Sequence, residues 1–312
     1  MKREIELTYS GFALNFAKSN LFKNMKKKNY EDSIFWAVEL DLSNQRPFLF
    51  ESLCLFCATN INASNPKIGR FLNKFRKDFE FFGKKSDEFK HDDSKDLLNQ
   101  ICQSIAFVVG VITFSPKDIP LRPVVAMSLD ETEENLVISS TMKYNYNTLV
   151  LDIKDSCDSP FLVRILSKLT NSIIEGSTSE SYRTISIILH FEKSKKYKKL
   201  VEAAARRNLL IPSKFRKSWI FFLIELLLRI AVEKGIVEII QPWCELFIFN
   251  FRDGKKKSQL MFYIYTCIDL LSRHRLREVN CIFNREKITK GCVAIECMYS
   301  DIINARKHES NM

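Results

Sequence analysis

Residues 47–58 read PFLFESLCLFCA, and this stretch decides the fold class because nearly every position is apolar over a length typical of a helix. A helix that is apolar nearly all round is packed on several sides, so the stretch predicts a central helix of a core. Pro47 suits the first turn of that helix, and Asn65-Pro66 marks a break before the next one. Residues 219–228 form a similar run, which an internal glutamate and a following arginine leave too short and too charged to span a bilayer.

Apolar residues on both sides of these runs recur every three or four positions, which is the helical period. Helices are therefore expected near residues 12–16, 30–38, 47–58, 68–82, 96–111, 161–174, 218–233, 241–250 and 258–273, with a weaker candidate at 287–308. The pattern predicts a mainly α protein, either a helical bundle or a short stack of helical hairpins. An apolar helix, a proline-marked helix and a second apolar helix follow one another in both the first and last thirds. This order fits an internal repeat or coincidence equally well.

The middle of the chain has a different character. Three prolines fall between residues 115 and 123, and residues 130–135 form an acidic turn. Short, partly β-branched runs of strand length lie nearby, at 124–129, 136–140, 149–153 and 183–191, and the last of these fits a strand or a buried helix. We therefore expect a small β element or an irregular connector. The predicted division is an N-terminal helical domain at 1–114, a connector at 115–160 and a C-terminal helical domain at 161–312.

The 312 residues carry a net charge of +11, with a pI near 9.1, which favours contact with a polyanion such as DNA, RNA or an anionic membrane. Lysine-driven solubility in a protein encoded by AT-rich DNA is the alternative explanation. Nine scattered cysteines and an N-terminus without an apolar signal-peptide core predict reduced thiols and an intracellular location, cytoplasmic or nuclear.

No segment carries a recognisable arrangement for catalysis. Cys54 and Cys57 have the CxxC spacing, but no second ligand pair completes a zinc site, so both are expected in the core. The four histidines stand in unrelated contexts, the acidic clusters are typical of solvated loops, and no phosphate-binding glycine motif occurs. The sequence therefore predicts a binding protein that is not an enzyme and needs neither a metal nor another cofactor.

Clusters of lysine and arginine are the recurring polar feature, and each is expected in a loop or at a helix end. Flexible lysines in such places neutralise phosphates without reading base sequence. The candidate nucleic-acid-binding residues are Lys26, Lys27, Lys28, Lys195, Lys196, Tyr197, Lys198, Lys199, Arg206, Arg207, Lys214, Arg216 and Lys217. The stretch from 193 to 217 is the strongest candidate, because Glu202 alone offsets its cations and Tyr197 could stack on a base. Ordinary solvated surface is the competing interpretation.

Residues 14–79 contain a basic run, then YEDSIFWAVEL at 30–40, LCLFCA at 53–58 and Ser64-Asn65-Pro66. This pattern resembles the helical C-terminal region of clamp-loader-like AAA+ ATPases of the replication-associated recombination protein A type. Residues 60–63, NINA, replace that family's acidic stretch, and the ATPase module is missing. The resemblance implies a collar-like oligomerisation domain or a helical domain close to DNA, without the motor.

Two kinds of function follow from these features. The first is a nucleic-acid-associated accessory protein of DNA replication or recombination, with DNA favoured over RNA and with a homo-oligomer or a replication protein as a further partner. The second is a structural or host-interaction protein, possibly viral, that has no nucleic-acid role. A diverged enzyme and an RNA-processing or transcription accessory are further alternatives.

Overall fold

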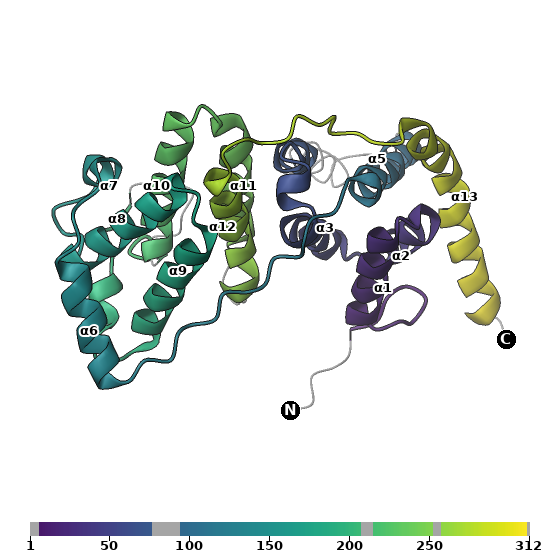
Figure 1. The fold of residues 1–312 in the computed structure, drawn as a ribbon. Coiled ribbons are helices and arrows are strands. Elements are labelled where there is room, and N and C mark those ends of the chain that lie inside the picture. Colours follow the sequence, from purple (N-terminus) through teal and green to yellow (C-terminus); the bar gives the residue numbers. More distant parts are fainter. Residues whose placement is uncertain (1–5, 77–93, 207–214, 252–256, 311–312) are drawn as a thin grey trace. The chain divides into compact units, whose positions relative to one another are not determined.

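The computed structural model describes residues 6–76, 94–206, 215–251 and 257–310 (Figure 1). Within these ranges the regular structure is helical, and the β contacts are the isolated bridges Leu7–Ala13 and Glu202–Ser218. The prediction of a mainly α fold is thus confirmed. The chain divides into two compact units, unit 1 with residues 1–120 and 277–312 and unit 2 with residues 121–276.

Unit 1 is built around a long helix, α5, which contacts four of the labelled helices of the unit. Its elements are α1 (Leu14–Lys27), α2 (Tyr30–Leu42), α3 (Arg46–Asn60), the 3-10 turn η1 (Asn62–Ser64), a helix at 68–76, α5 (Ser94–Phe114) and α13 (Arg285–Ser310). Helix α3 contains the run that decided the fold class. It has Pro47 in its first turn, and Phe56, Cys57 and Ala58 are fully buried, so the predicted central helix is confirmed.

Helix α13 packs against α5 and α2, although more than 170 residues separate it from α5. Its buried side chains, Ile288, Ile295 and Tyr299, recur at helical spacing. A β-carbon at Gly291 would clash with the ring of Tyr30, so glycine permits the close approach of this helix. The hydroxyl of Tyr30 donates to the carbonyl oxygen of Ala106 at 2.9 Å, which adds a buried polar contact to the seam.

Unit 2 is organised around α8, which contacts five of the other labelled helices of the unit. Its elements are α6 (Glu131–Met142), α7 (Thr148–Ile153), α8 (Pro160–Ile174), α9 (Thr178–Lys193), the 3-10 turn η2 (Lys198–Val201), α10 (Trp219–Glu233), α11 (Val237–Asn250) and α12 (Lys257–Ser272). Helix α10 holds the second apolar run and buries ten of its fifteen residues. Within the part of the chain that the structure describes, no helix combines the length and apolar character needed to cross a membrane.

The short runs in the middle of the chain do not form a sheet. Residues 136–140, 149–153 and 183–191 lie in α6, α7 and α9, and residues 124–129 are irregular. An Asp130–Glu133 capping box starts α6, which favours a helix over the strand expected from its β-branched residues. In α9, burial at 181, 184, 185, 188 and 191 follows the helical period, which extends beyond the nine-residue run.

The division of the chain also differs from the expected one. Residues 277–312 pack with the N-terminal part of the chain, whereas a C-terminal domain at 161–312 was expected. The expected connector is divided near residue 120, because its later part packs into unit 2 as α6 and α7. The physical reason is that the apolar stripe of α13 fits α5 and α2, a long-range match that local periodicity does not reveal.

Candidate nucleic-acid interface

The end of α9 and the turn that follows it carry a dense run of exposed cations. Lys193, Lys195, Lys196, Lys198 and Lys199 are all exposed. The backbone is nevertheless ordered by hydrogen bonds, since Lys198 N–H donates to the Ser194 carbonyl and η2 closes the next turn. We call residues 193–206 together with 215–217 the basic segment. Its lysines combine an ordered backbone with side chains exposed to solvent.

A short antiparallel contact joins the two parts of the basic segment. Ala203 N–H donates to the carbonyl of Lys217 at 3.1 Å, and Arg206 N–H donates to that of Arg216 at 3.1 Å. Lys217 is exposed and Arg216 is half-buried. The structure therefore places Arg216 and Lys217 beside the backbone of Ala203 and Arg206, which lies earlier in the chain. Arg207 and Lys214, also predicted as contacts, lie outside the described residues.

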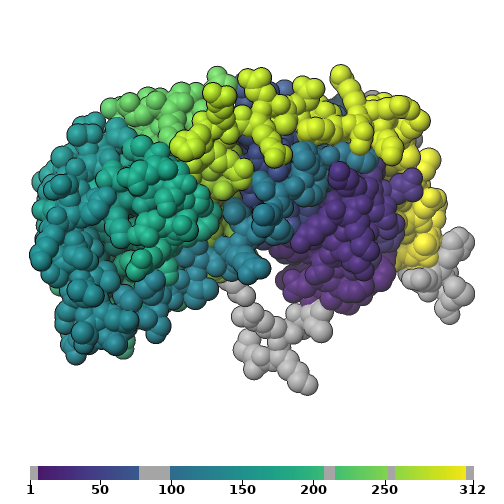
Figure 2. Space-filling model, in the orientation of Figure 1, coloured from purple at the N-terminus to yellow at the C-terminus, as the bar shows by residue number. Residues whose placement is uncertain are grey.

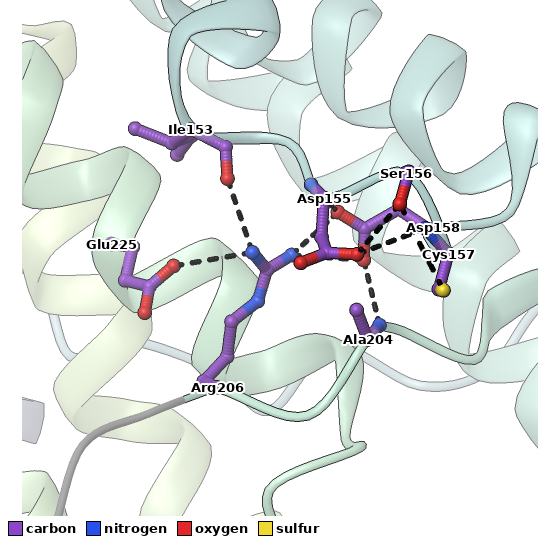
Figure 3. Close-up of polar contacts among 8 residues, drawn as sticks. All are labelled: Ile153, Asp155, Ser156, Cys157, Asp158, Ala204, Arg206 and Glu225. Atoms are coloured by element: carbon purple, nitrogen blue, oxygen red, sulfur yellow. Dashed lines mark hydrogen bonds and ion pairs between the residues drawn. The ribbon is translucent and has the colours of Figure 1, made fainter.

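Arg206 has a different role from the predicted phosphate contact. Its side chain is 6% exposed, and Figure 3 shows the guanidinium directed toward Asp158, Glu225 and the carbonyl of Ile153. Nη2 lies 2.9 Å and 3.0 Å from the two Asp158 carboxylate oxygens, and Nη1 lies 3.1 Å from the Ile153 oxygen. The guanidinium carbon also lies 3.9 Å from the centre of the Phe222 ring. Because these contacts occupy the guanidinium inside the protein, Arg206 is an anchor of the segment.

Asp158 is the buried acidic partner of Arg206. In addition to Arg206, its carboxylate accepts hydrogen bonds from Ala204 N–H and Asp155 N–H, both at 2.7 Å (Figure 3). The turn between α7 and α8 is thereby pinned to the basic segment. Burial raises the pKa of nearby Glu225 above its ordinary value, with Arg206 opposing that shift. The anchor thus fixes the backbone from which the lysines extend.

Tyr197 is placed differently from the base-stacking ring that the sequence suggested. It is half-buried and packs edge to face with Phe191, with ring centres 5.8 Å apart. The Lys196 ammonium lies 4.7 Å from the centre of the Tyr197 ring. Ring packing in the protein therefore explains Tyr197 better than stacking on a base.

Lys196 is also the lysine of this run with an acidic partner. Its ammonium lies 2.8 Å from a carboxylate oxygen of Glu131, and both side chains are exposed. The hydrogen bond to Glu131 raises the pKa of Lys196, and the same bond lowers that of Glu131. Exposed ion pairs are weak and screened by salt, so Glu131 is an easily displaced competitor for a phosphate.

Lys26, Lys27 and Lys28 lie in unit 1, where α1 ends. All three are exposed, and Lys28 ends the helix in the left-handed conformation, with φ 60°. The predicted contact residues therefore belong to two units, Lys26–Lys28 to unit 1 and the basic segment to unit 2.

The thiols of Cys54 and Cys57 are buried in α3, as the sequence predicted. Burial raises the pKa of both thiols, which disfavours the thiolate form that binds metals. Among the residues that the structure describes, no three or more His, Cys, Asp or Glu side chains are grouped so that they could hold a metal ion.

An open hollow of about 720 Å³ in unit 1 is lined by polar residues that include Asp41, Arg46, Cys102 and Tyr299. Its buried polar groups already bind one another. Arg46 Nε donates to Asp41 at 2.5 Å, and the Tyr299 hydroxyl donates to the same carboxylate at 2.8 Å. This network ties α13 to α2 and leaves Asp41 occupied.

Two polar residues of unit 2 were missed by the sequence patterns. His190 lies between the Met127 carbonyl and Glu134, at 2.9 Å and 2.8 Å, and so links α9 to α6. Asp158 is the central acceptor of the Arg206 anchor. Sequence patterns did not mark either residue, because their side-chain partners Glu134 and Arg206 lie 56 and 48 residues away.

Known proteins provide no template for this chemistry. No protein-family model, curated protein or solved structure matches the chain. The basic segment is therefore interpreted from its own residues and their contacts.

Proposed function

We propose that the protein is a non-enzymatic, nucleic-acid-associated protein that binds the phosphate backbone through the basic segment. The observation that supports this proposal is the group of five exposed lysines in the seven residues 193–199, with Lys217 on adjoining backbone. An ammonium group is a compact charge with rotatable donors, which suits phosphates of varied position. Contacts of this kind give salt-dependent binding with little sequence preference.

The difference in environment between Arg206 and the lysines supports the same proposal. Arg206 is held inside the protein by Asp158, whereas the lysines extend outward from the backbone that this pair fixes. Lysines on an ordered backbone lose less conformational freedom on binding than lysines on an unstructured tail. The segment therefore combines positioned charges with flexible side-chain ends.

DNA is the polymer we propose, with RNA as the alternative. This preference, and a role in replication or recombination, depends on the resemblance of residues 14–79 to the helical region of the clamp-loader-like ATPases. The same resemblance suggests self-association or a replication protein as a further partner. Each of these points is separable from phosphate binding by experiment.

The test is fluorescence anisotropy with labelled single-stranded DNA, duplex DNA and RNA at two salt concentrations. Replacing Lys195, Lys196, Lys198 and Lys199 by glutamate should weaken binding to all sequences alike. The slope of log affinity against log salt should fall by up to about three to four for duplex DNA, since each lost contact releases about 0.9 counterions fewer.

A matched control separates the segment from general charge. Lys143 and Lys154 are exposed in the same unit but lie outside the basic segment. The Lys143→Glu/Lys154→Glu variant should bind much more tightly than the Lys198→Glu/Lys199→Glu variant, although both change the net charge equally. Equal affinities would remove the segment from the interface, and no binding by the parent protein at low salt would contradict the proposal.

A protein-interaction function is the second candidate, and exposed apolar side chains of unit 2 favour it. Leu136 on α6 is 68% exposed and Val125 before it is 73% exposed, while α6 buries only Thr141. If the parent protein binds no nucleic acid, this surface becomes the leading site. The Leu136→Ser variant would then be expected to lose a protein partner without loss of helix content.

A further inference from the structure

A cluster of aromatic rings lies on the outer side of the α1–α2 hairpin in unit 1. The Phe12 and Phe16 ring centres are 6.0 Å apart, and Trp36 of α2 packs against them at 5.2 Å and 5.6 Å. Phe16 is nevertheless 52% exposed and Phe12 is 37% exposed. The N-terminal helices, purple in Figure 2, lie at the surface of the molecule.

The core of unit 1 does not require these exposed rings. Helix α1 buries its other face, through Leu14, Ala17, Leu21 and Met25. Phe16 therefore points away from the helix face that holds α1 in the unit. Clustered apolar groups at a surface commonly mark a binding site, because leaving them in water costs free energy without a packing gain.

Lysines continue the same face of α1 beyond the rings. Lys23 and Lys27 follow Phe16 by seven and eleven residues, which returns each of them to within about 20° of its direction on an α-helix. The rise of the helix places them about 10 Å and 16 Å along the axis from Phe16. Both are exposed, and neither forms an ion pair with a described residue.

The charge of this surface is positive but not uniform. Lys23 and Lys26–Lys28 are exposed at the end of α1, while Glu31 and Asp32 are exposed at the start of α2. Asp32 accepts a hydrogen bond from the Asn29 side chain at 2.6 Å. This surface thus has four exposed cations and two exposed carboxylates, which leaves an excess of positive charge.

We propose that this aromatic and basic face of unit 1 binds single-stranded nucleic acid. Bases stack on the exposed rings of Phe12 and Phe16, which Trp36 supports edge to face, and the phosphates that follow contact Lys23 and Lys27. This inference rests on the proposed nucleic-acid function and adds the class of strand. Unpaired bases expose the ring faces that stacking needs, whereas a duplex hides them, so the face selects single strands.

Trp36 gives a direct readout of this contact in the full-length protein. The chain has three tryptophans, and Trp219 and Trp243 are 1% and 0% exposed, while Trp36 is half-exposed. A saturable quenching of tryptophan emission is expected on titration with a thymidine oligonucleotide. A DNA hairpin without unpaired ends should quench much less at equal phosphate concentration.

The variants Phe16→Ala and Phe16→Tyr separate stacking from general effects on the fold. Loss of the ring should weaken binding of the thymidine oligonucleotide by at least about fivefold, because stacking on one aromatic side chain contributes at least that much. Phe16→Tyr keeps the ring and should bind like the parent protein. Val293→Ala removes a 74% exposed apolar side chain elsewhere in unit 1 and should leave binding unchanged.

The charge component has its own matched pair. Lys23→Glu/Lys27→Glu should lower the salt dependence of oligonucleotide binding, whereas Lys287→Glu/Lys290→Glu, at two exposed lysines of α13 and with the same change of net charge, should not. All variants are first compared by thermal melting, so that a loss of binding is read only from folded protein.

Three outcomes would overturn the inference, and they differ from one another. If Phe16→Ala binds like the parent and Trp36 is not quenched, while the lysine variants of the basic segment still lose affinity, this face is excluded and the proposed function stands. If the parent protein binds no nucleic acid, both proposals fail. If Phe16→Ala changes self-association in sedimentation but not oligonucleotide affinity, the face is a protein contact.

Discussion

Arg206 in unit 2 is buried and Lys117 in unit 1 is half-buried, and these two cations are held in different ways. Arg206 in unit 2 faces the carboxylate of Asp158 at 2.9 Å. Lys117 in unit 1 donates to the carbonyl oxygens of Ile112, Thr113 and Ser115, at 2.8–3.0 Å, and contacts no carboxylate among the described residues. Burial lowers the pKa of Lys117 to about 8. A desolvated cation without an opposite charge nearby thus favours its neutral form, whereas a paired cation is held in place by its carboxylate partner.

The same comparison extends to the exposed lysines of the basic segment. Arg206 and Lys199 are close in sequence and both basic, yet one is 6% exposed and the other is exposed to solvent. Their environments differ, because Arg206 anchors the backbone inside the protein, whereas the exposed lysines are the phosphate contacts of the proposed function. Charge counted along the sequence does not distinguish these roles.

The largest expected effect is on the paired cation. Asp158→Ala should lower the free energy of unfolding by about 3–5 kcal/mol, because it removes the buried carboxylate that pairs with Arg206 and leaves only the more distant and more exposed Glu225. Urea unfolding followed by circular dichroism measures this change. Asp152→Ala, which removes an exposed partner of Arg229 at 3.3 Å, should cost less than about 1 kcal/mol.

A double variant tests whether the loss comes from the unpaired charge. Asp158→Ala/Arg206→Met removes both charges and keeps an apolar chain over Phe222, so it should recover part of the stability. A double variant as unstable as the sum of the two single variants would contradict the pairing explanation.

The next effect concerns the unpaired cation and depends on pH. The folded pKa of Lys117, about 8, lies below its ordinary value of 10.5. Between these values the unfolded chain binds the extra proton, so this group makes stability rise with pH. The contribution is about 3 kcal/mol over the full interval.

Lys117→Met isolates this contribution, because other groups that titrate in the same interval are common to both proteins. The stability of the parent relative to Lys117→Met should increase from pH 7 to pH 10. Urea unfolding at several pH values measures the difference. A constant difference across the interval would show that Lys117 keeps its ordinary titration in the folded protein.

The smallest effect is expected at the surface pair. Glu131→Gln frees Lys196 from its exposed partner and should raise nucleic-acid affinity by less than about fivefold, and only at low salt. Stability should not change measurably. Anisotropy at two salt concentrations checks the direction, and weaker binding by this variant would argue that Lys196 faces away from the nucleic acid.

The sequence alone determined the helical character of the protein and much of its core. Residues 47–58 and 219–228 are apolar nearly all round, and such runs require burial away from water whatever their partners are. The burial of Cys54 and Cys57 and the exposure of Lys195 and its neighbours followed from the same local patterns.

Tertiary structure decided how these elements are grouped and which cations are available. The packing of α13 on α5 and the pairing of Arg206 with Asp158 each depend on partners that sequence periodicity does not identify. Arg206 and Asp158 are 48 residues apart, so no local pattern marks them as a pair. Periodicity reports which side of an element faces inward, whereas the neighbour that it meets there is fixed only when the chain packs.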